Sequence, residues 1–338
     1  YKDEAAAQGR PFFAYAAYTS PHWPLQVPEA ELDRYSGVFD EGYDVWRERN
    51  FERLKEAGIL PARHELPPRN EAIPHWDDLE PEMRAYYTRA MELYAAMLEN
   101  LDGHVGRLVE TLQANGTYDN TLILFLSDNG AAYRDWWHGG EAYDYVRANY
   151  DNSPERWGRP GSWVSYGPGW AEAGSAPFSR HKTYARQGGL ISPLIARGPT
   201  VAGEGRREDA YVTVMDLAPT IMELAGGSYP DDGSARPMEG RSITRLLSGE
   251  VDLIHDDTSI TTVYHSSRAY VRRGKWKIAT LERPFDESKF ELFDIDADPG
   301  ETRDLRDVEP ERYREMVDLW RSEKERLGIR LETERPDS

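Results

Sequence analysis

The sequence predicts an α/β fold with one large domain, residues 1–253, and a smaller C-terminal antiparallel α+β subdomain, residues 254–338. Three observations support this prediction. A helical period of apolar residues over 81–114 is followed by a continuous apolar run at 121–126, as expected for a helix and strand of an α/β unit. Near residue 250 the pattern changes to short alternating segments and one terminal helix.

A first strand is predicted close to the start of the chain. Residues 11–19 form an apolar, β-rich run, and Pro21 and Pro24 end it because proline cannot donate to a sheet. His22 is therefore expected on a loop at the C-terminal end of this strand. Because the chain opens on Tyr1 and a core strand follows almost at once, we expect that a further segment lies upstream.

The clearest element is a long amphipathic helix over 81–114. Its apolar residues recur at spacings of three and four: Tyr86, Met91, Tyr94, Met97, Leu98, Leu101, Val105, Leu108 and Leu112. Asn115-Gly116 ends the helix, and the run at 121–126 predicts a strand buried on both faces of a parallel sheet. Asp128 and Asn129 then lie at the carboxyl end of this strand, where such sheets place their ligands.

The remaining elements follow from shorter patterns. Residues 131–180 are rich in tryptophan and glycine without clear periodicity, and we expect a long loop that shapes a site. A strand over 190–196 and a helix over 212–225 complete the large domain. In the subdomain we expect strands at 259–264, 269–271, 276–280 and 290–293, followed by a helix from about 310 to 327.

Composition excludes several classes of function. The formal net charge of −19 repels nucleic acid and anionic membrane surfaces, and no apolar run approaches the roughly 20 residues that span a bilayer. The 338 residues contain no cysteine, so thiol nucleophiles, thiolate metal sites and disulfides are absent from them. An anionic small-molecule substrate requires a locally positive site, which a bound cation and a lysine can provide.

Taken singly, the candidate site residues have ordinary explanations. Asp128-Asn129 offers hard oxygen ligands suited to Ca²⁺ or Mg²⁺, but Asp-Asn-Gly is also a common turn sequence. His22 alone fits a loop histidine with satisfied hydrogen bonds, and Lys182 alone fits a solvated surface charge.

Taken together, these stretches resemble successive motifs of the sulfatase family, of the bacterial arylsulfatase type, in the family's order. The matching sequences are Ser20-Pro21-His22-Trp23-Pro24-Leu25, Leu126-Ser127-Asp128-Asn129-Gly130, Ser165 to Ala171, His181-Lys182, Gly188-Gly189, Arg268 to Lys277, and Glu291 to Asp294 with Asp298-Pro299. The resemblance spans nearly the whole chain.

The resemblance implies an alkaline-phosphatase-like mixed sheet flanked by helices, a catalytic domain over 1–253, and hydrolysis of a small-molecule sulfate ester. In this family a formylglycine, made from Cys or Ser in a Cys/Ser-x-Pro-x-Arg motif, attacks sulfur beside a bound calcium ion. Asp128 and Asn129 match the calcium ligands, with Mg²⁺ the less favoured ion. Lys182 and His22 match the lysine and histidine that contact the sulfate and assist departure of the alcohol.

The chain departs from the family pattern in several places. No Cys/Ser-x-Pro-x-Arg motif occurs, since there is no cysteine and neither Ser175 nor Ser179 begins it. The family's first aspartate pair and its Lys-x-His element are also unmatched. We therefore expect these groups upstream and expect the chain alone to be inactive and to bind calcium weakly, because Asp128 and Asn129 supply only part of its oxygen shell. Gln187 replaces the family's usual glutamate before Gly188-Gly189.

Two other functions remain open at this stage. The same cation-centred site accepts tetrahedral phosphorus, so a phosphomonoester or phosphonate hydrolase is the alternative within the superfamily. A non-catalytic sulfatase fragment is the alternative in another class, because the nucleophile motif is absent.

Overall fold

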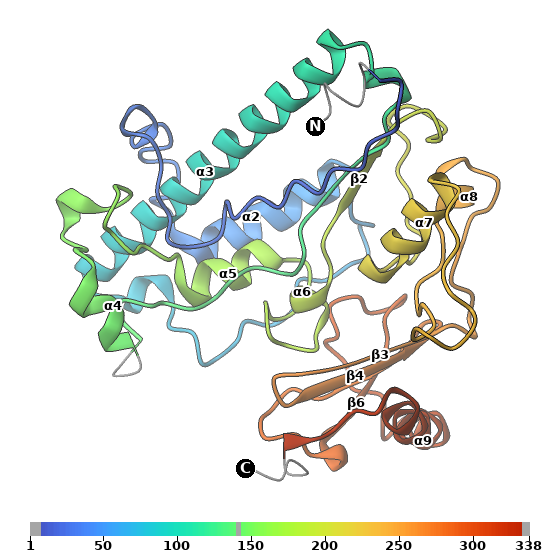
Figure 1. Ribbon diagram of the computed structural model, residues 1–338. Helices are drawn as coiled ribbons and strands as arrows, with labels where there is room; N and C mark the ends of the chain where they lie inside the picture. Colours follow the sequence, from blue (N-terminus) through green and yellow to red (C-terminus); the bar gives the residue numbers. More distant parts are fainter. Residues whose placement is uncertain (1–7, 140–142, 333–338) are drawn as a thin grey trace.

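The structure, a computed structural model, describes residues 8–139 and 143–332. Figure 1 shows a helical body beside a two-stranded ribbon, with a separate antiparallel sheet at the C-terminal end. The α-helices are α2 (Gly42–Glu56), α3 (Pro81–Ala114), α4 (Asp144–Asn149), α5 (Gly167–Ser175), α6 (Gln187–Leu190), α7 (Leu217–Leu224), α8 (Thr244–Leu247) and α9 (Pro310–Leu327). The strands are β1 (Ile123–Leu126), β2 (Leu194–Arg197), β3 (Ile260–His265), β4 (Arg268–Arg273), β5 (Trp276–Ala279) and β6 (Glu291–Asp294).

The long helix α3 confirms the prediction from apolar spacing. It begins with Pro81 at its first turn, where the missing amide hydrogen costs nothing, and Gly116 follows its end with a φ of 71°. The face of α3 that carries Ala90, Leu93 and Ala96 is fully buried. Short side chains on this face let other segments approach the helix closely.

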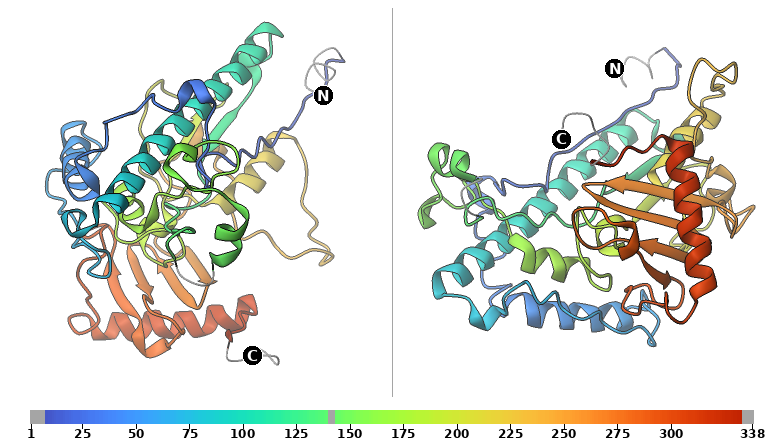
Figure 2. Two further views of the ribbon diagram at one scale, coloured as in Figure 1. Left: turned by 90° about the vertical axis from the view of Figure 1, so that its left-hand side faces the viewer. Right: turned by 90° about the horizontal axis from the view of Figure 1, so that it is seen from below.

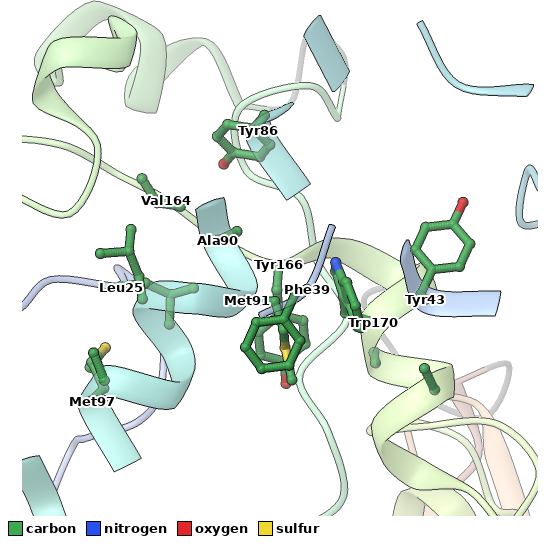
Figure 3. Close-up of a cluster of buried hydrophobic side chains, with 14 of the residues drawn as sticks. Leu25, Phe39, Tyr43, Tyr86, Ala90, Met91, Met97, Val164, Tyr166 and Trp170 are labelled. Carbon is green, nitrogen blue, oxygen red and sulfur yellow. The ribbon is translucent and has the colours of Figure 1, made fainter. Parts of the chain in front are cut away.

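The core of the helical body forms where α3 meets α5 and α2. Trp170 of α5 is 1% exposed, and Phe39 and Tyr43 contact its ring edge-on with centroid separations of 5.5 and 6.0 Å. Figure 3 shows Trp170 beside Phe39, Met91 and Tyr166 in this cluster. Burying these rings against one another stabilises α5 in the core.

The predicted parallel strands form an antiparallel ribbon. β1 pairs with β2 in the register Phe125 to Ile195, and these two side chains are 40% and 63% exposed. The prediction of a strand buried on both faces is therefore wrong within the described residues. A continuous apolar run predicts a strand but does not show whether it pairs parallel or antiparallel, because this depends on the strand that lies next to it in the fold.

The predicted first strand is also absent from the structure. Residues 11–19 are extended but unpaired, and Phe13 and Tyr15 are 70% and 84% exposed. Neither of the two described sheets includes this segment as a hydrogen-bonded strand. An extended apolar run becomes a strand only when another strand accepts its backbone hydrogen bonds. His22 consequently lies on a turn rather than at the end of a strand.

The region 131–180 is more ordered than a single loop. It contains α4 and α5, and α5 carries the buried Trp170 into the core. The helix predicted over 212–225 is observed as a short 3₁₀ turn at Val214–Asp216 followed by α7. A capping box between Thr213 and Asp216 begins this turn.

The C-terminal sheet confirms the predicted strands and helix. Its strands lie in the order β3-β4-β5-β6, all antiparallel, and α9 covers one face (Figure 2). Trp320 of α9 is 0% exposed and packs against Phe290, with ring centroids 5.7 Å apart. The alternating strand pattern points one set of side chains toward this helix. The boundary between residues 253 and 254 stays a prediction.

None of the helices in the described part of the chain combines the length and the apolar character needed to cross a membrane.

Candidate active site at the 128–131 turn and the 180–189 segment

The acid-amide pair lies on a turn directly after β1. Ser127 Oγ donates to the Asn129 carbonyl oxygen at 3.0 Å, and Asn129 Nδ2 donates to the Gly130 carbonyl at 3.0 Å. This second bond uses the amide nitrogen of Asn129 and leaves its side-chain oxygen for another partner. Asp128 is exposed, and its carboxylate forms no ion pair with a described residue. The turn therefore has free hard oxygen donors.

A glycine contact joins this turn to the 180–189 segment. Gly130 N donates to Gly189 O at 3.3 Å, and a Cβ on Gly130 would lie 1.9 Å from Gly188 O. On the other side, Lys182 N donates to Ala131 O at 3.0 Å. The backbone of the predicted metal turn and the backbone of the predicted lysine segment are thus bound to each other at two points.

The lysine segment has a strained backbone. Arg180 and Thr183 adopt φ angles of 67° and 78°, in the left-handed region that a β-branched residue rarely enters. Arg268 Nη1 from β4 donates to Thr183 O at 3.3 Å and helps to hold this conformation. Lys182 lies between the two strained residues, is half-buried, and has no ion-pair partner in the described parts of the chain. Strain of this kind is concentrated at functional sites.

His181 is a buried, neutral anchor next to Lys182. Its ring stacks on Tyr133 with centroids 4.4 Å apart, and its Nδ1 lies 3.2 Å from Lys182 O. Burial lowers the pKa of His181 to about 4, against the effect of the hydrogen bond to Lys182, and the positive charges of Arg180 and Arg268 act in the same direction as burial. The imidazole is therefore uncharged at neutral pH and fixes the direction of the segment by packing.

Aromatic contacts connect the His22 turn to the loop that follows the Asp128-Asn129 turn. His22 is exposed, and its Nδ1 donates to Trp23 O at 2.9 Å, which leaves Nε2 as the nitrogen free to exchange a proton. Trp23 contacts Trp136 with ring centroids 4.9 Å apart, and Trp136 follows the metal turn in sequence. The structure links the three loops, but within the described residues no hydrogen bond or ion pair joins His22, Asp128, Asn129 or Lys182 side chains to one another.

Unpaired cations surround these loops. Arg134 lies over the rings of Tyr133 and Trp136, at 5.9 and 5.5 Å from their centroids, and the described residues give it no acidic partner. Arg180 and Arg268 both lie over Tyr184, at 5.6 and 4.1 Å. Because these three arginines have no acidic partner among the described residues, their charges make the region locally positive.

One charged group near the site was missed in the sequence. Asp135 accepts hydrogen bonds from Tyr87 OH at 2.7 Å and from His138 Nδ1 at 2.8 Å. Burial raises the pKa of Asp135, but the bonds and charge of His138 and the bond from Tyr87 outweigh it, so the pKa of this carboxyl lies below its usual range. In the sequence, the only signal for this pair was the spacing of three residues between Asp135 and His138. The cluster fixes the 131–138 loop on α3.

The ligands that Asp128 and Asn129 offer are of the kind that a hard cation binds, but they are too few to complete its coordination shell. Asp128 and Asn129 offer carboxylate and amide oxygens, as Ca²⁺ and Mg²⁺ require, but Ca²⁺ takes about six to eight oxygens. Within residues 8–139 and 143–332 no group of three or more His, Asp or Glu side chains is placed to hold a metal ion. Further ligands are therefore needed besides these two residues.

Comparison with family models matches residues 1–228 to the sulfatase family and residues 180–327 to the family described as N-sulphoglucosamine sulphohydrolase, C-terminal. The chain belongs to the sulfatase family. An uncharacterized sulfatase of Schizosaccharomyces pombe is 33% identical over 326 residues, which cover 91% of this chain and 57% of that protein. An arylsulfatase of Klebsiella aerogenes is 39% identical over 249 residues, which cover 72% of this chain and 53% of that protein. This sulfatase chain spans about half the length of these relatives.

Solved structures share the fold of this sulfatase. The crystal structure of Ps i-CgsB has a TM-score of 0.60 and 21% identity, over 95% of this chain and 51% of that chain. A phosphonate monoester hydrolase from Silicibacter pomeroyi has a TM-score of 0.50 and 19% identity, over 96% of this chain and 57% of that chain. The prediction of an alkaline-phosphatase-like α/β fold is confirmed.

The glycine contact leads to a prediction about Gly130. In a Gly130→Ala variant the new Cβ meets Gly188 O, so the two segments must separate, and we expect a loss of about 1–3 kcal/mol in the free energy of unfolding. Chemical denaturation measures this loss. The matched control is Gly174→Ala in α5, where no atom lies within 4 Å of the new Cβ. We expect the control to be neutral or slightly stabilising, and equal losses in both variants would contradict the contact.

The buried imidazole leads to a prediction about pH. In the unfolded chain His181 takes up a proton below its ordinary pKa of 6.5, whereas in the folded chain its pKa is about 4. The unfolded state therefore binds more protons between these values, and stability falls as the pH is lowered from 6.5 to 4, by at most about 3 kcal/mol from this residue. His181→Phe keeps the ring and removes the titration. Denaturation of both proteins across this range should show a smaller acid loss in the variant.

Proposed function

We propose that the protein that contains this chain hydrolyses sulfate monoesters of small molecules, of the aryl ester type. The single observation that carries the proposal is the pair of backbone links between the Asp128-Asn129 turn and the Lys182 segment, with the carboxylate and the ammonium left unpaired. A cation and a lysine that face a common ligand suit a tetrahedral dianion or monoanion. The unpaired arginines nearby support the same class of substrate, because the rest of the chain repels anions.

The proposed roles follow from the chemistry of each group. Asp128 and Asn129 hold calcium, together with ligands from outside these residues, and the ion stabilises negative charge on the sulfuryl oxygens when it is bound. Lys182 offsets charge on the sulfate and on the leaving oxygen. His22, when both ring nitrogens are protonated, donates the Nε2 proton to the oxygen of the departing alcohol and becomes neutral. The nucleophile is a formylglycine that lies outside these 338 residues, since they contain no Cys/Ser-x-Pro-x-Arg motif.

A substrate comparison tests the reaction class. We expect the complete natural protein to hydrolyse 4-nitrophenyl sulfate much faster than 4-nitrophenyl phosphate, and Lys182→Met to lower kcat by about 100- to 1000-fold because it removes charge stabilisation in the transition state. Exposed Lys289→Met is the control and should leave the rate unchanged. A higher rate on the phosphate ester, or on a phosphonate monoester, would favour the alternative hydrolase class instead.

Removal of the metal tests the role of the acid-amide pair. We expect a chelator to abolish sulfatase activity and Ca²⁺ to restore it better than Mg²⁺, because the larger ion tolerates the irregular oxygen shell that a turn provides. Asp128→Asn should weaken calcium binding and so raise the calcium concentration that gives half of the maximal rate. Activity that is indifferent to both treatments would argue against a metal at this turn.

A further inference from the structure

A buried ion pair lies between the C-terminal sheet and the candidate site. Lys277 Nζ of β5 is 2.7 Å from Glu301 Oε1, and the two side chains are 1% and 0% exposed. Glu301 itself adopts a φ of 53°, so its backbone is held in the left-handed region. Two charges removed from water in this way require a specific arrangement of partners.

The remaining polar groups of the pair are directed at Gln187, the first residue of α6. Glu301 Oε2 accepts from Gln187 N at 2.6 Å, and Lys277 Nζ donates to Gln187 Oε1 at 3.4 Å. Gln187 is 8% exposed, so these bonds lie away from solvent. Together they fix both the backbone and the side chain of one residue that belongs to the 180–189 segment.

From Gln187 the contacts lead directly to the metal turn. Gly188 N donates to Ser179 O at 3.0 Å, and a Cβ on Gly188 would lie 2.2 Å from Arg180 O. On its other side, Gly188 O lies 1.9 Å from the place where Gly130 would carry a Cβ. Gly188 is thus packed between the strained start of the lysine segment and the turn that bears Asp128 and Asn129. A shift of Gln187 carries Gly188 with it. Gly188 must then displace either the backbone at Arg180 or the turn at Gly130, because it is in close contact with both.

The chemistry of the pair suits positioning better than stabilisation. Replacing a buried ion pair with apolar side chains is often neutral or stabilising, so the pair is not required for burial alone. Burial lowers the pKa of Lys277 to about 8, although the charge of Glu301 acts in the opposite direction. What the pair offers over apolar side chains is directional hydrogen bonding to Gln187.

We propose that Lys277 and Glu301 are positioning residues for the sulfatase site: they hold Gln187, and through Gly188 and Gly189 they set the position of the Asp128-Asn129 turn relative to Lys182. The inference rests on the proposed function. It assigns to the C-terminal sheet a part in the active site without contact with substrate. The loss expected on disrupting such a supporting partner is about 10- to 100-fold in metal affinity or activity.

The test compares two double variants of the complete natural protein. Lys277→Met/Glu301→Gln removes both charges but keeps a side-chain oxygen that can accept from Gln187 N, whereas Lys277→Met/Glu301→Leu removes both charges and that oxygen. We expect the Leu variant to lose about 10- to 100-fold in kcat and in calcium affinity, and the Gln variant to retain most of both. Lys275→Met, which breaks the exposed pair of Lys275 with Asp294, is the control and should change neither.

A readout that does not depend on activity is hydrogen exchange at the amides of Gly130 and Lys182. We expect faster exchange at both in the Leu variant, with Trp320 and the core of the C-terminal sheet unchanged. Equal kcat, calcium affinity and exchange in the two double variants would overturn the inference, as would losses that follow the melting temperature alone. If the Leu variant does not fold, Lys277→Met/Glu301→Met, which also removes that oxygen but keeps the length of the side chain, is compared with the Gln variant in the same way.

Failure of the two proposals can be told apart. Absence of sulfatase activity in the wild-type protein overturns the proposed function, and the exchange measurement still tests the link from Glu301 to Gly130. Full activity in wild type and in the Leu variant overturns only the positioning role.

Discussion

The site depends on the contact between Gly130 and Gly188, two backbones with no side chain between them. The two backbones are so close that a Cβ on Gly130 would lie 1.9 Å from Gly188 O, and the bond from Gly130 N to Gly189 O holds them together. Asp128 and Lys182 are placed by this contact rather than by bonds of their own. Their charged groups consequently remain available for a ligand.

The C-terminal sheet forms part of the same arrangement. Arg268 of β4 supports the strained Thr183, and Lys277 of β5 reaches Gln187. Arg186 forms an ion pair with Glu291 of β6 and lies 4.3 Å from the centroid of the Phe293 ring. Three neighbouring strands thus contact residues 183–187 of the lysine segment.

The distribution of charge agrees with an anionic substrate. The chain carries a net charge of −19, yet Arg134, Arg180 and Lys182 have no acidic partner among the described residues. Aromatic faces hold the two arginines in place of carboxylates. An arginine on a ring keeps its full charge for a ligand, whereas one in an ion pair is largely neutralised.

The sequence alone determined the elements whose signal is local. The apolar period of α3 and the alternation of β3 to β6 predicted those elements, because side-chain direction along one helix or strand depends only on its own residues. The resemblance identified the family, and it is the source of the proposed roles of Asp128, Asn129, Lys182 and His22. Only the tertiary structure decided that β1 and β2 are antiparallel and that residues 11–19 are unpaired, since strand pairing is a contact between distant segments. The Lys277–Glu301–Gln187 cluster was undetectable for the same reason: its members are far apart in the chain and meet only in the folded protein.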